Sequence, residues 1–244
     1  MSASAAAVAV DRPVTIALRG VSRLYGVGAS EVRALDGIDF DVAPGEFVAL
    51  MGPSGAGKST CLHILGCLDR PTRGRYFFQG VDVANLSREQ TALLRRHFIG
   101  FIFQGFNLLS RTTALENVEL PLIYRRVPRK ERHARAQEML ALVGLEGREG
   151  HTPSELSGGQ QQRVAIARAM VTNPAVVLAD EPTGNLDSAM GEEIMRLLTR
   201  LNEERGLTIV MVTHEASIAA FANREVHFRD GRIASDRPTR EVIV

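Results

Sequence analysis

The residues with the clearest chemistry form a glycine-rich loop, Gly52-Pro53-Ser54-Gly55-Ala56-Gly57-Lys58-Ser59-Thr60. The loop follows an apolar run at residues 47–51 and precedes a helical pattern at residues 60–68. Glycines let successive backbone N–H groups converge on phosphate oxygens, and the N-terminus of the following helix adds roughly half a positive charge. The spacing predicts a nucleotide phosphate site, with Lys58 on the β and γ phosphates and the Ser59 hydroxyl on Mg²⁺. A chance glycine turn is the alternative, and the flanking strand and helix patterns argue against it.

A pair of carboxylates supplies the second part of the chemistry. The apolar run at residues 176–179 ends in Asp180 and Glu181. A carboxylate at the end of such a strand helps to hold Mg²⁺ in phosphate-binding enzymes, and we assign that role to Asp180. Alternation along a strand predicts that Glu181 points the other way, where it would polarise a water in line with the γ phosphate. The alternative is that the two acids merely cap a strand.

A third motif, Leu156-Ser157-Gly158-Gly159-Gln160, opens a helical run at residues 161–171. A serine hydroxyl and a Gly-Gly backbone at a helix N-terminus predict a second anion site, because unsatisfied N–H groups and the helix dipole favour phosphate there. An ordinary N-cap would explain Ser157 but not the paired glycines.

Together, the three motifs resemble those of the ATP-binding-cassette ATPases, whose signature motif is this pentapeptide. The resemblance covers residues 18–233 and implies hydrolysis of ATP to ADP and phosphate, with ATP and Mg²⁺ as cofactors. It also implies the fold class: an α/β P-loop NTPase (RecA-like) core with a parallel-rich sheet, a small antiparallel β subdomain and an inserted α-helical subdomain.

The resemblance assigns roles to four more residues. Tyr25 looks like the aromatic side chain that stacks on adenine, with a simple packed tyrosine as the alternative. Gln104 resembles the loop glutamine that touches Mg²⁺ and the attacking water. His214 resembles the histidine that bonds the γ phosphate, although a histidine after a strand is usually structural. Asp187 looks like the aspartate that crosses a dimer interface.

Partners also follow from the resemblance. It implies that two copies pair head to tail, so that Ser157 and Gly159 of one copy complete the ATP site of the other. Residues around the motifs, including Gly184-Asn185, resemble the lipoprotein-release and macrolide-export branch, whose ATPases drive an integral membrane permease. We expect a peripheral location on the cytoplasmic face of the inner membrane. A cell-division-type regulator is the main alternative; a translation or repair cassette and a small-substrate kinase are weaker ones.

The elements that must position these residues follow from the apolar pattern. Short β-rich runs alternate with longer helical patterns, which is typical of a mainly parallel sheet flanked by helices. We expect a flexible tail at residues 1–12 and one nucleotide-binding domain at 13–244, with its core at 13–110 and 173–244 and a helical subdomain at 111–172. The strands are expected at residues 15–21, 47–51, 99–103, 176–179 and 208–212. The helices of the subdomain are expected at residues 115–123, 129–143 and 157–171.

Composition limits the function classes. The 244 residues are 45% hydrophobic and 23% charged, which excludes a mainly disordered chain. Twenty-nine Lys and Arg against 28 Asp and Glu give a net charge of +1, so we expect no nucleic-acid partner. No apolar stretch approaches the ~18 residues of a membrane-spanning helix, so we expect the permease to be a separate chain.

One dense basic run lies in the expected helical subdomain. It is either a solvated helix face or a patch that contacts anionic lipid or the loops of the membrane partner. The run consists of Arg125, Arg126, Arg129, Lys130, Arg132, His133 and Arg135.

Overall fold

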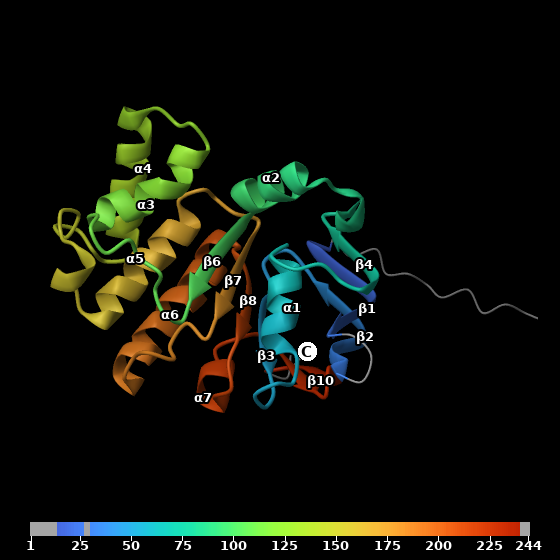
Figure 1. Cartoon of the computed structure of the whole chain (residues 1–244). Coiled ribbons are helices and arrows are strands. Elements are labelled where there is room, and N and C mark those ends of the chain that lie inside the picture. The colour runs from blue at the N-terminus through green and yellow to red at the C-terminus, as the bar shows by residue number, and fades with distance from the viewer. Residues whose placement is uncertain (1–13, 27–29, 240–244) are drawn as a thin grey trace, which may run out of the picture.

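A six-stranded sheet forms the centre of the molecule (Figure 1). The computed structural model describes residues 14–26 and 30–239, and the predicted tail at residues 1–12 lies outside the described residues. The strand order is β10-β9-β3-β8-β7-β6, in which β10 is antiparallel to β9 and the other neighbours are parallel. The strands are β3 (Phe47–Met51), β6 (Ile99–Phe103), β7 (Val176–Asp180), β8 (Thr208–Val212), β9 (Arg224–Arg229) and β10 (Arg232–Pro238).

The side chains of the central strands alternate between two hydrophobic cores. In β3, Phe47 and Ala49 belong to the core on one face of the sheet, and Val48 and Leu50 belong to the core on the other. A strand that is buried on both faces reads as a continuous apolar run. For this reason the sequence predicts β3, β6, β7 and β8 to within one residue.

A second, antiparallel sheet covers one face of this centre, with helix α1 (Lys58–Leu65) in the same core. Its strand order is β2-β1-β4-β5. The fold class predicted from the sequence, a P-loop core with a parallel-rich sheet, a small antiparallel sheet and added helices, is confirmed. The strands of this sheet are β1 (Ile16–Tyr25), β2 (Val32–Val42), β4 (Arg73–Phe78) and β5 (Val81–Asp82).

Most of the remaining helices cover the other face and one end of the large sheet (Figure 1). Helices α3, α4 and α5 pack on one another at that end, in the chain region where the sequence predicts a helical subdomain. The subdomain boundaries at residues 111 and 172 stay predictions. The elements are η2 (Val83–Asn85), α2 (Arg88–Phe98), α3 (Ala114–Tyr124), α4 (Arg129–Leu142), η3 (Pro153–Glu155), α5 (Gly158–Met170), α6 (Ser188–Arg205) and α7 (Ala216–Ala219).

Within the described residues, none of these helices is both long enough and apolar enough to cross a membrane.

Candidate nucleotide site

The glycine-rich loop between β3 and α1 forms one wall of a cavity of about 640 Å³. The cavity brings together residues from four parts of the chain: strand β2, the loop with the start of α1, the segment after β7 and the segment after β8. Its lining consists of Val32, Ala34, Pro53, Ser54, Gly55, Gly57, Lys58, Ser59, Thr60, Glu181 and His214.

Close backbone packing explains two of the loop glycines. Gly52 and Gly57 have φ angles of 139° and 104°, in the region that favours glycine. A Cβ on Gly52 would lie 2.3 Å from the carbonyl oxygen of Phe228, and one on Gly57 would lie 2.3 Å from that of Ala34. Gly55 has a φ of 80° but open space around its Cβ position. The loop is therefore pressed between β2 and β9 on two sides, while Gly55 faces open space.

Helix α1 begins directly in this cavity. Its N-cap is Gly57, which has no side chain to bond the free N–H groups of the first turn, and the first turn contains no acidic residue. These N–H groups and the helix dipole are available to an anion. The ammonium of Lys58 donates to the carbonyl oxygens of Gly52 at 2.8 Å and Pro53 at 2.9 Å. Burial lowers the pKa of Lys58, and the carboxylates of Glu181 and Asp180 oppose this shift.

Asp180 and Ser59 provide oxygen atoms suited to Mg²⁺. Burial raises the pKa of Asp180; His63 opposes the rise, Glu181 adds to it, and Lys58 and the hydrogen bond from Ser59 oppose it. Mg²⁺ is usually held by one or two carboxylates together with phosphate oxygens and water. A half-buried carboxylate beside a hydroxyl and a second carboxylate fits that ion. No group of three or more His, Cys, Asp or Glu side chains that could hold a metal occurs among the residues described.

Glu181 and His214 form a pair at the cavity wall. Nδ1 of His214 lies 3.1 Å from Oε1 of Glu181, and both residues line the cavity. The expectation that strand alternation orients Glu181 is wrong, because β7 ends at Asp180 and Glu181 has a left-handed backbone with a φ of 44°. Its backbone N–H donates to the carbonyl oxygen of Val212 at the end of β8. A turn anchored to the neighbouring strand therefore places the carboxylate.

Gln104 does not line the cavity of the single chain. It follows β6, is exposed, and lies against the loop that follows Glu181. The side-chain amide of Asn185 donates to the backbone oxygen of Gln104 at 3.0 Å, and a Cβ on Gly184 would lie 2.7 Å from the Gln104 amide nitrogen. Its predicted contact with Mg²⁺ stays a prediction.

Tyr25 also lies outside the cavity lining. Its hydroxyl donates to Asp69 at 2.7 Å, and the guanidinium of Arg23 lies 4.4 Å from the centre of its ring. Tyr25 is 39% exposed at the end of β1. Arg23 contacts the ring through a cation–π interaction. The assignment of Tyr25 to adenine stacking stays a prediction.

The signature residues form a second helix terminus, which lies outside the cavity. Oγ of Ser157 accepts from the backbone N–H of Gln160 at 3.3 Å, and Oε1 of Gln160 accepts from the N–H of Ser157 at 3.0 Å. This capping box starts α5. A Cβ on Gly158 would lie 3.3 Å from Leu186, and one on Gly159 would lie 3.2 Å from the Met190 sulfur.

Asp187 serves as the N-cap of α6, the helix next to this terminus. Its Oδ1 accepts from the N–H of Met190 at 2.9 Å. Both Ser157 and Asp187 are exposed. Within one chain, the structure therefore separates the predicted site residues that line the cavity from a second group at the starts of α5 and α6, while Tyr25 and Gln104 belong to neither.

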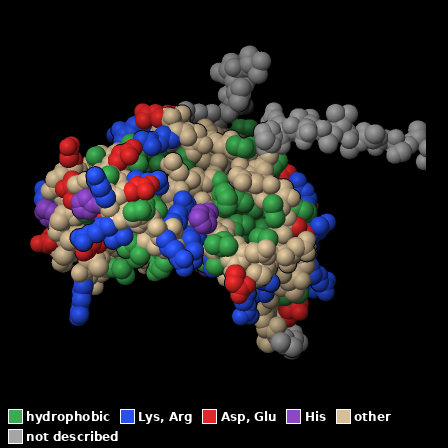
Figure 2. All heavy atoms as spheres, turned by 90° about the horizontal axis from the view of Figure 1, so that it is seen from above, with side chains coloured by type: hydrophobic (Ala, Val, Ile, Leu, Met, Phe, Trp, Pro, Cys, Tyr) green, Lys and Arg blue, Asp and Glu red, His purple; other side chains and the backbone are tan. Residues whose placement is uncertain are grey.

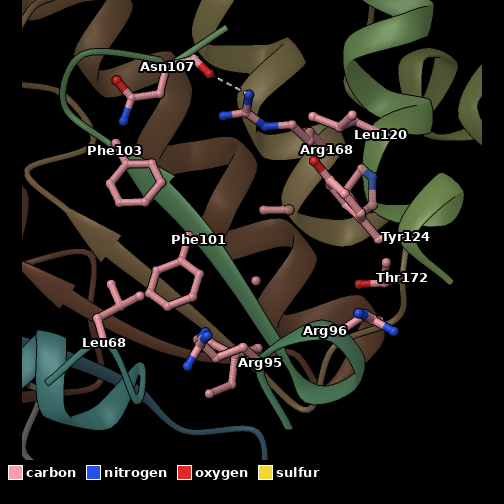
Figure 3. Close-up of a pocket in the computed structure, with 14 residues that line it drawn as sticks. Leu68, Arg95, Arg96, Phe101, Phe103, Asn107, Leu120, Tyr124, Arg168 and Thr172 are labelled. Carbon is pink, nitrogen blue, oxygen red and sulfur yellow. Dashed lines mark hydrogen bonds between the residues drawn. The ribbon is translucent and has the colours of Figure 1, made fainter. Parts of the chain in front are cut away.

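A second hollow, of about 430 Å³, was not foreseen from the sequence (Figure 3). It lies between α2, β6, α3 and α5, and its surface is apolar, with Leu68 and Tyr124 more than half exposed. Phe101 and Phe103 stack with ring centres 5.7 Å apart. Three arginines, Arg95, Arg96 and Arg168, also line it, and no carboxylate does.

The arginines of this hollow bind backbone carbonyls. Arg168 donates to the carbonyl oxygens of Phe106 and Asn107, as Figure 3 shows for Asn107, and Arg95 donates to that of Cys67. Burial lowers the pKa of Arg168. None of these three arginines forms an ion pair among the described residues, and no carboxylate lines the hollow.

Most of the basic run at residues 125–135 is engaged within the chain. Arg125 donates to two carbonyl oxygens at the end of α2, while Arg132 and His133 both contact the buried Glu119. Arg135 pairs with Glu131. Figure 2 shows Lys and Arg side chains interspersed with hydrophobic ones on one face of the molecule. These contacts favour the reading of the run as a helix face over a dedicated lipid patch.

Comparison with known proteins places this geometry in a family. Residues 35–184 match the family model described as "ABC transporter". The chain belongs to the ABC transporter family. This family couples ATP hydrolysis to transport. The prediction that the chain is an ATPase is therefore confirmed at the level of the family.

Two relatives show how much of the chain the similarity covers. It is 52% identical to the "Macrolide export ATP-binding/permease protein MacB" of Azoarcus sp. (strain BH72), over 96% of this chain and 36% of that protein. It is 54% identical to an "Uncharacterized ABC transporter ATP-binding protein" of Thermotoga maritima, over 87% of this chain and 91% of that one. The chain thus spans about a third of the macrolide-export relative.

A solved structure of high similarity is the ATP-binding cassette MJ0796, described as a dimer in a post-hydrolysis state bound to ADP and Pi. The TM-score is 0.84 at 46% identity, covering 92% of this chain and 99% of that one.

Proposed function

We propose that this ABC cassette binds MgATP in the 640 Å³ cavity and hydrolyses it there. The observation that carries the proposal is the meeting of the glycine loop, the uncapped start of α1 and the Glu181–His214 pair in one cavity. Each feature matches one requirement of phosphoryl transfer to water: anion binding, charge stabilisation and orientation of the nucleophile.

The roles of the residues follow from their positions. The loop amides and Lys58 hold the phosphates, and Lys58 reaches them by leaving its bonds to the loop carbonyls. Ser59 and Asp180 would hold Mg²⁺, and Gln104, outside the cavity of the single chain, is the third ligand that we propose. When bound, Mg²⁺ neutralises the charge of the phosphates. Glu181 accepts a hydrogen bond from the attacking water, and the contact with His214 orients the Glu181 carboxylate.

The second group of site residues supports a head-to-tail dimer. Ser157 and Gly159 lie outside the cavity of their own chain, and Ser157, the N-cap of α5, is exposed. In such a dimer, the α5 terminus of each copy would face the γ phosphate held by the other. Ser157 remains competent for this role, because its oxygen accepts from Gln160 while its O–H stays available to donate to phosphate. The related cassette is described as a dimer, which supports dimerisation of this chain.

The partner proposed for this dimer is an integral membrane permease of the macrolide-export or lipoprotein-release type. The similarity to proteins named macrolide export ATP-binding/permease supports the branch. We place the chain peripherally at the cytoplasmic face of the inner membrane. A cell-division-type regulator stays the alternative, and co-purification of a division complex in place of a permease would favour it.

We further propose that the permease docks in the second hollow (Figure 3). An exposed apolar surface such as this one is typical of a protein–protein interaction site. The three arginines, with no carboxylate beside them, favour a permease segment that carries an acidic residue. Tyr124→Glu would place a carboxylate on the apolar surface and should abolish co-purification of the permease while leaving ATP binding intact. Retained co-purification would contradict this docking site.

Replacement of the proposed catalytic carboxylate tests the hydrolytic proposal. Glu181→Gln should keep ATP affinity while lowering turnover by about 100- to 10,000-fold, the range typical of a lost general base. ATP binding is measured by calorimetry and turnover by phosphate release. Glu215→Gln, an exposed carboxylate outside the cavity, serves as the matched control and should retain the parental rate. A Glu181→Gln variant with parental turnover would remove Glu181 from the mechanism.

A further inference from the structure

A buried glutamine connects helix α5 to the loop that carries Glu181. Gln162 is the fifth residue of α5, and none of its surface is exposed. Its Nε2 donates to the carbonyl oxygen of Pro182 at 2.5 Å. Because Pro182 directly follows Glu181, this hydrogen bond acts on the peptide unit next to the carboxylate proposed for catalysis.

The conformation of Glu181 needs support from its surroundings. A non-glycine residue with a φ of 44° has a left-handed backbone, which costs about 1–2 kcal/mol. The N–H of Glu181 is fixed by Val212, and its carbonyl accepts from the N–H of Gly184. Pro182 has no N–H, so its carbonyl oxygen is the one backbone hydrogen-bonding group that this residue offers to a neighbour. Gln162 supplies that contact.

The other end of the same side chain shows that packing is not its main contribution. Oε1 of Gln162 is buried and has no hydrogen-bond partner among the described residues. A buried unpaired acceptor costs roughly 1–3 kcal/mol. A methionine would fill a similar volume without that cost. What glutamine adds at this position is the directed N–H toward Pro182.

We propose that Gln162 is a positioning residue for Glu181. It fixes the turn that points the carboxylate into the cavity and joins this turn to the helix that begins at Ser157. The inference rests on the proposed function, since it assumes that Glu181 assists hydrolysis.

The test compares two buried amides. Gln162→Met removes the bond to Pro182, whereas Asn202→Leu removes the bonds that Asn202 donates to the carbonyls of Gly45 and Leu207, away from the cavity. For Gln162→Met, we expect kcat to fall about 10- to 100-fold, as for a misplaced catalytic group, with KM for ATP and Tm near parental values. For Asn202→Leu, we expect a lower Tm with kcat near the parental value.

A second variant keeps the test decisive if Gln162→Met folds poorly. Gln162→Leu likewise removes the donor and adds no ionisable group, so it should lower kcat in the same way. A parental kcat in either folded variant would overturn the inference, as would a kcat that falls only in proportion to the folded fraction. Failure of the proposed function differs from both outcomes, because Glu181→Gln would then hydrolyse ATP at the parental rate.

Discussion

The N-termini of α1 and α5 are both preceded by glycine-containing motifs, yet they are built differently. At α1 the cap is Gly57, whose missing side chain leaves the first-turn N–H groups free and lets the loop approach Ala34. At α5 the cap is Ser157, whose side chain and that of Gln160 satisfy each other's backbone N–H groups. The first terminus lies in a cavity, and the N-cap of the second, Ser157, is exposed.

This difference indicates a division of labour between the two termini. The α1 terminus has the free donors and the enclosed space to hold phosphate within one chain. The α5 terminus is stable by itself and offers an anion only its remaining donors, chiefly the O–H of Ser157. We therefore expect α1 to determine the affinity for ATP and α5 to affect turnover in the dimer.

A charge at the α5 terminus should have the largest effect that separates the two roles. Ser157→Asp keeps a good N-cap, because aspartate caps helices about as well as serine. It places a carboxylate where the partner's γ phosphate is proposed to lie, so turnover should fall about 100-fold or more. Calorimetry should show unchanged ATP binding by the monomer, and thermal melting an unchanged Tm.

Ser157→Thr is the matched control, since it keeps both cap and hydroxyl and should keep most of the activity. If Ser157→Asp weakened ATP binding by the monomer as much as it lowered turnover, the proposed separation of roles would be wrong.

Backbone packing at the α1 terminus predicts a smaller effect, on stability. Gly57→Ala would push a methyl group against the Ala34 carbonyl and should cost about 2–3 kcal/mol of unfolding free energy. The Cβ position of Gly55 faces open space, so Gly55→Ala should lose only the free energy of placing alanine in a left-handed backbone, about 1–2 kcal/mol. Urea unfolding of both variants measures the difference, and equal losses would show that the contact with β2 does not constrain the loop.

Asp180 predicts the smallest effect, a pH-dependent one. Burial raises the pKa of Asp180 above its ordinary 3.8. Because this pKa is higher in the folded chain than in the unfolded chain, protonation of the carboxyl favours folding. The contribution is complete below the pKa of the unfolded chain and is lost as the pH rises through the pKa of the folded chain. Without nucleotide and Mg²⁺, Asp180→Asn should therefore be more stable than the parent at pH 7, by less than about 1 kcal/mol.

The Asp180→Asn advantage should disappear as the pH falls below about 3.8, which thermal melting across pH measures. A variant less stable than the parent at pH 7 would show that the ionised carboxylate supports the empty site.

Local sequence predicted the parts of the fold that are locally encoded. Strands buried on both faces are visible as apolar runs. The glycine loop and the Asp180-Glu181 strand end each predict their chemistry from a few adjacent residues. Strand β10 was missed because most of its side chains are exposed and few are apolar. Helix α2 was missed although Ser87 and Gln90 form a capping box that is visible in the sequence.

Other features depend on contacts between distant segments, which no local pattern contains. The approach of Ala34 to Gly57, the left-handed turn at Glu181 and the bond from Gln162 to Pro182 all join separate elements. The second hollow likewise forms only when α2, β6, α3 and α5 pack together. The sequence predicts which residues form the site, and tertiary packing determines how they are held.

A mixed-dimer assay tests the central claim, that each ATP site combines the α1 terminus of one copy with the α5 terminus of the other. Ser157→Asp and Glu181→Gln chains are mixed in equal amounts, and phosphate release is compared with that of each variant by itself. In a head-to-tail dimer, every mixed pair contains one site with both defects and one intact site. The account predicts recovery to about a quarter of the parental rate, since about half the dimers are mixed and each has one working site. A mixture no more active than the mean of the two separate variants would contradict it.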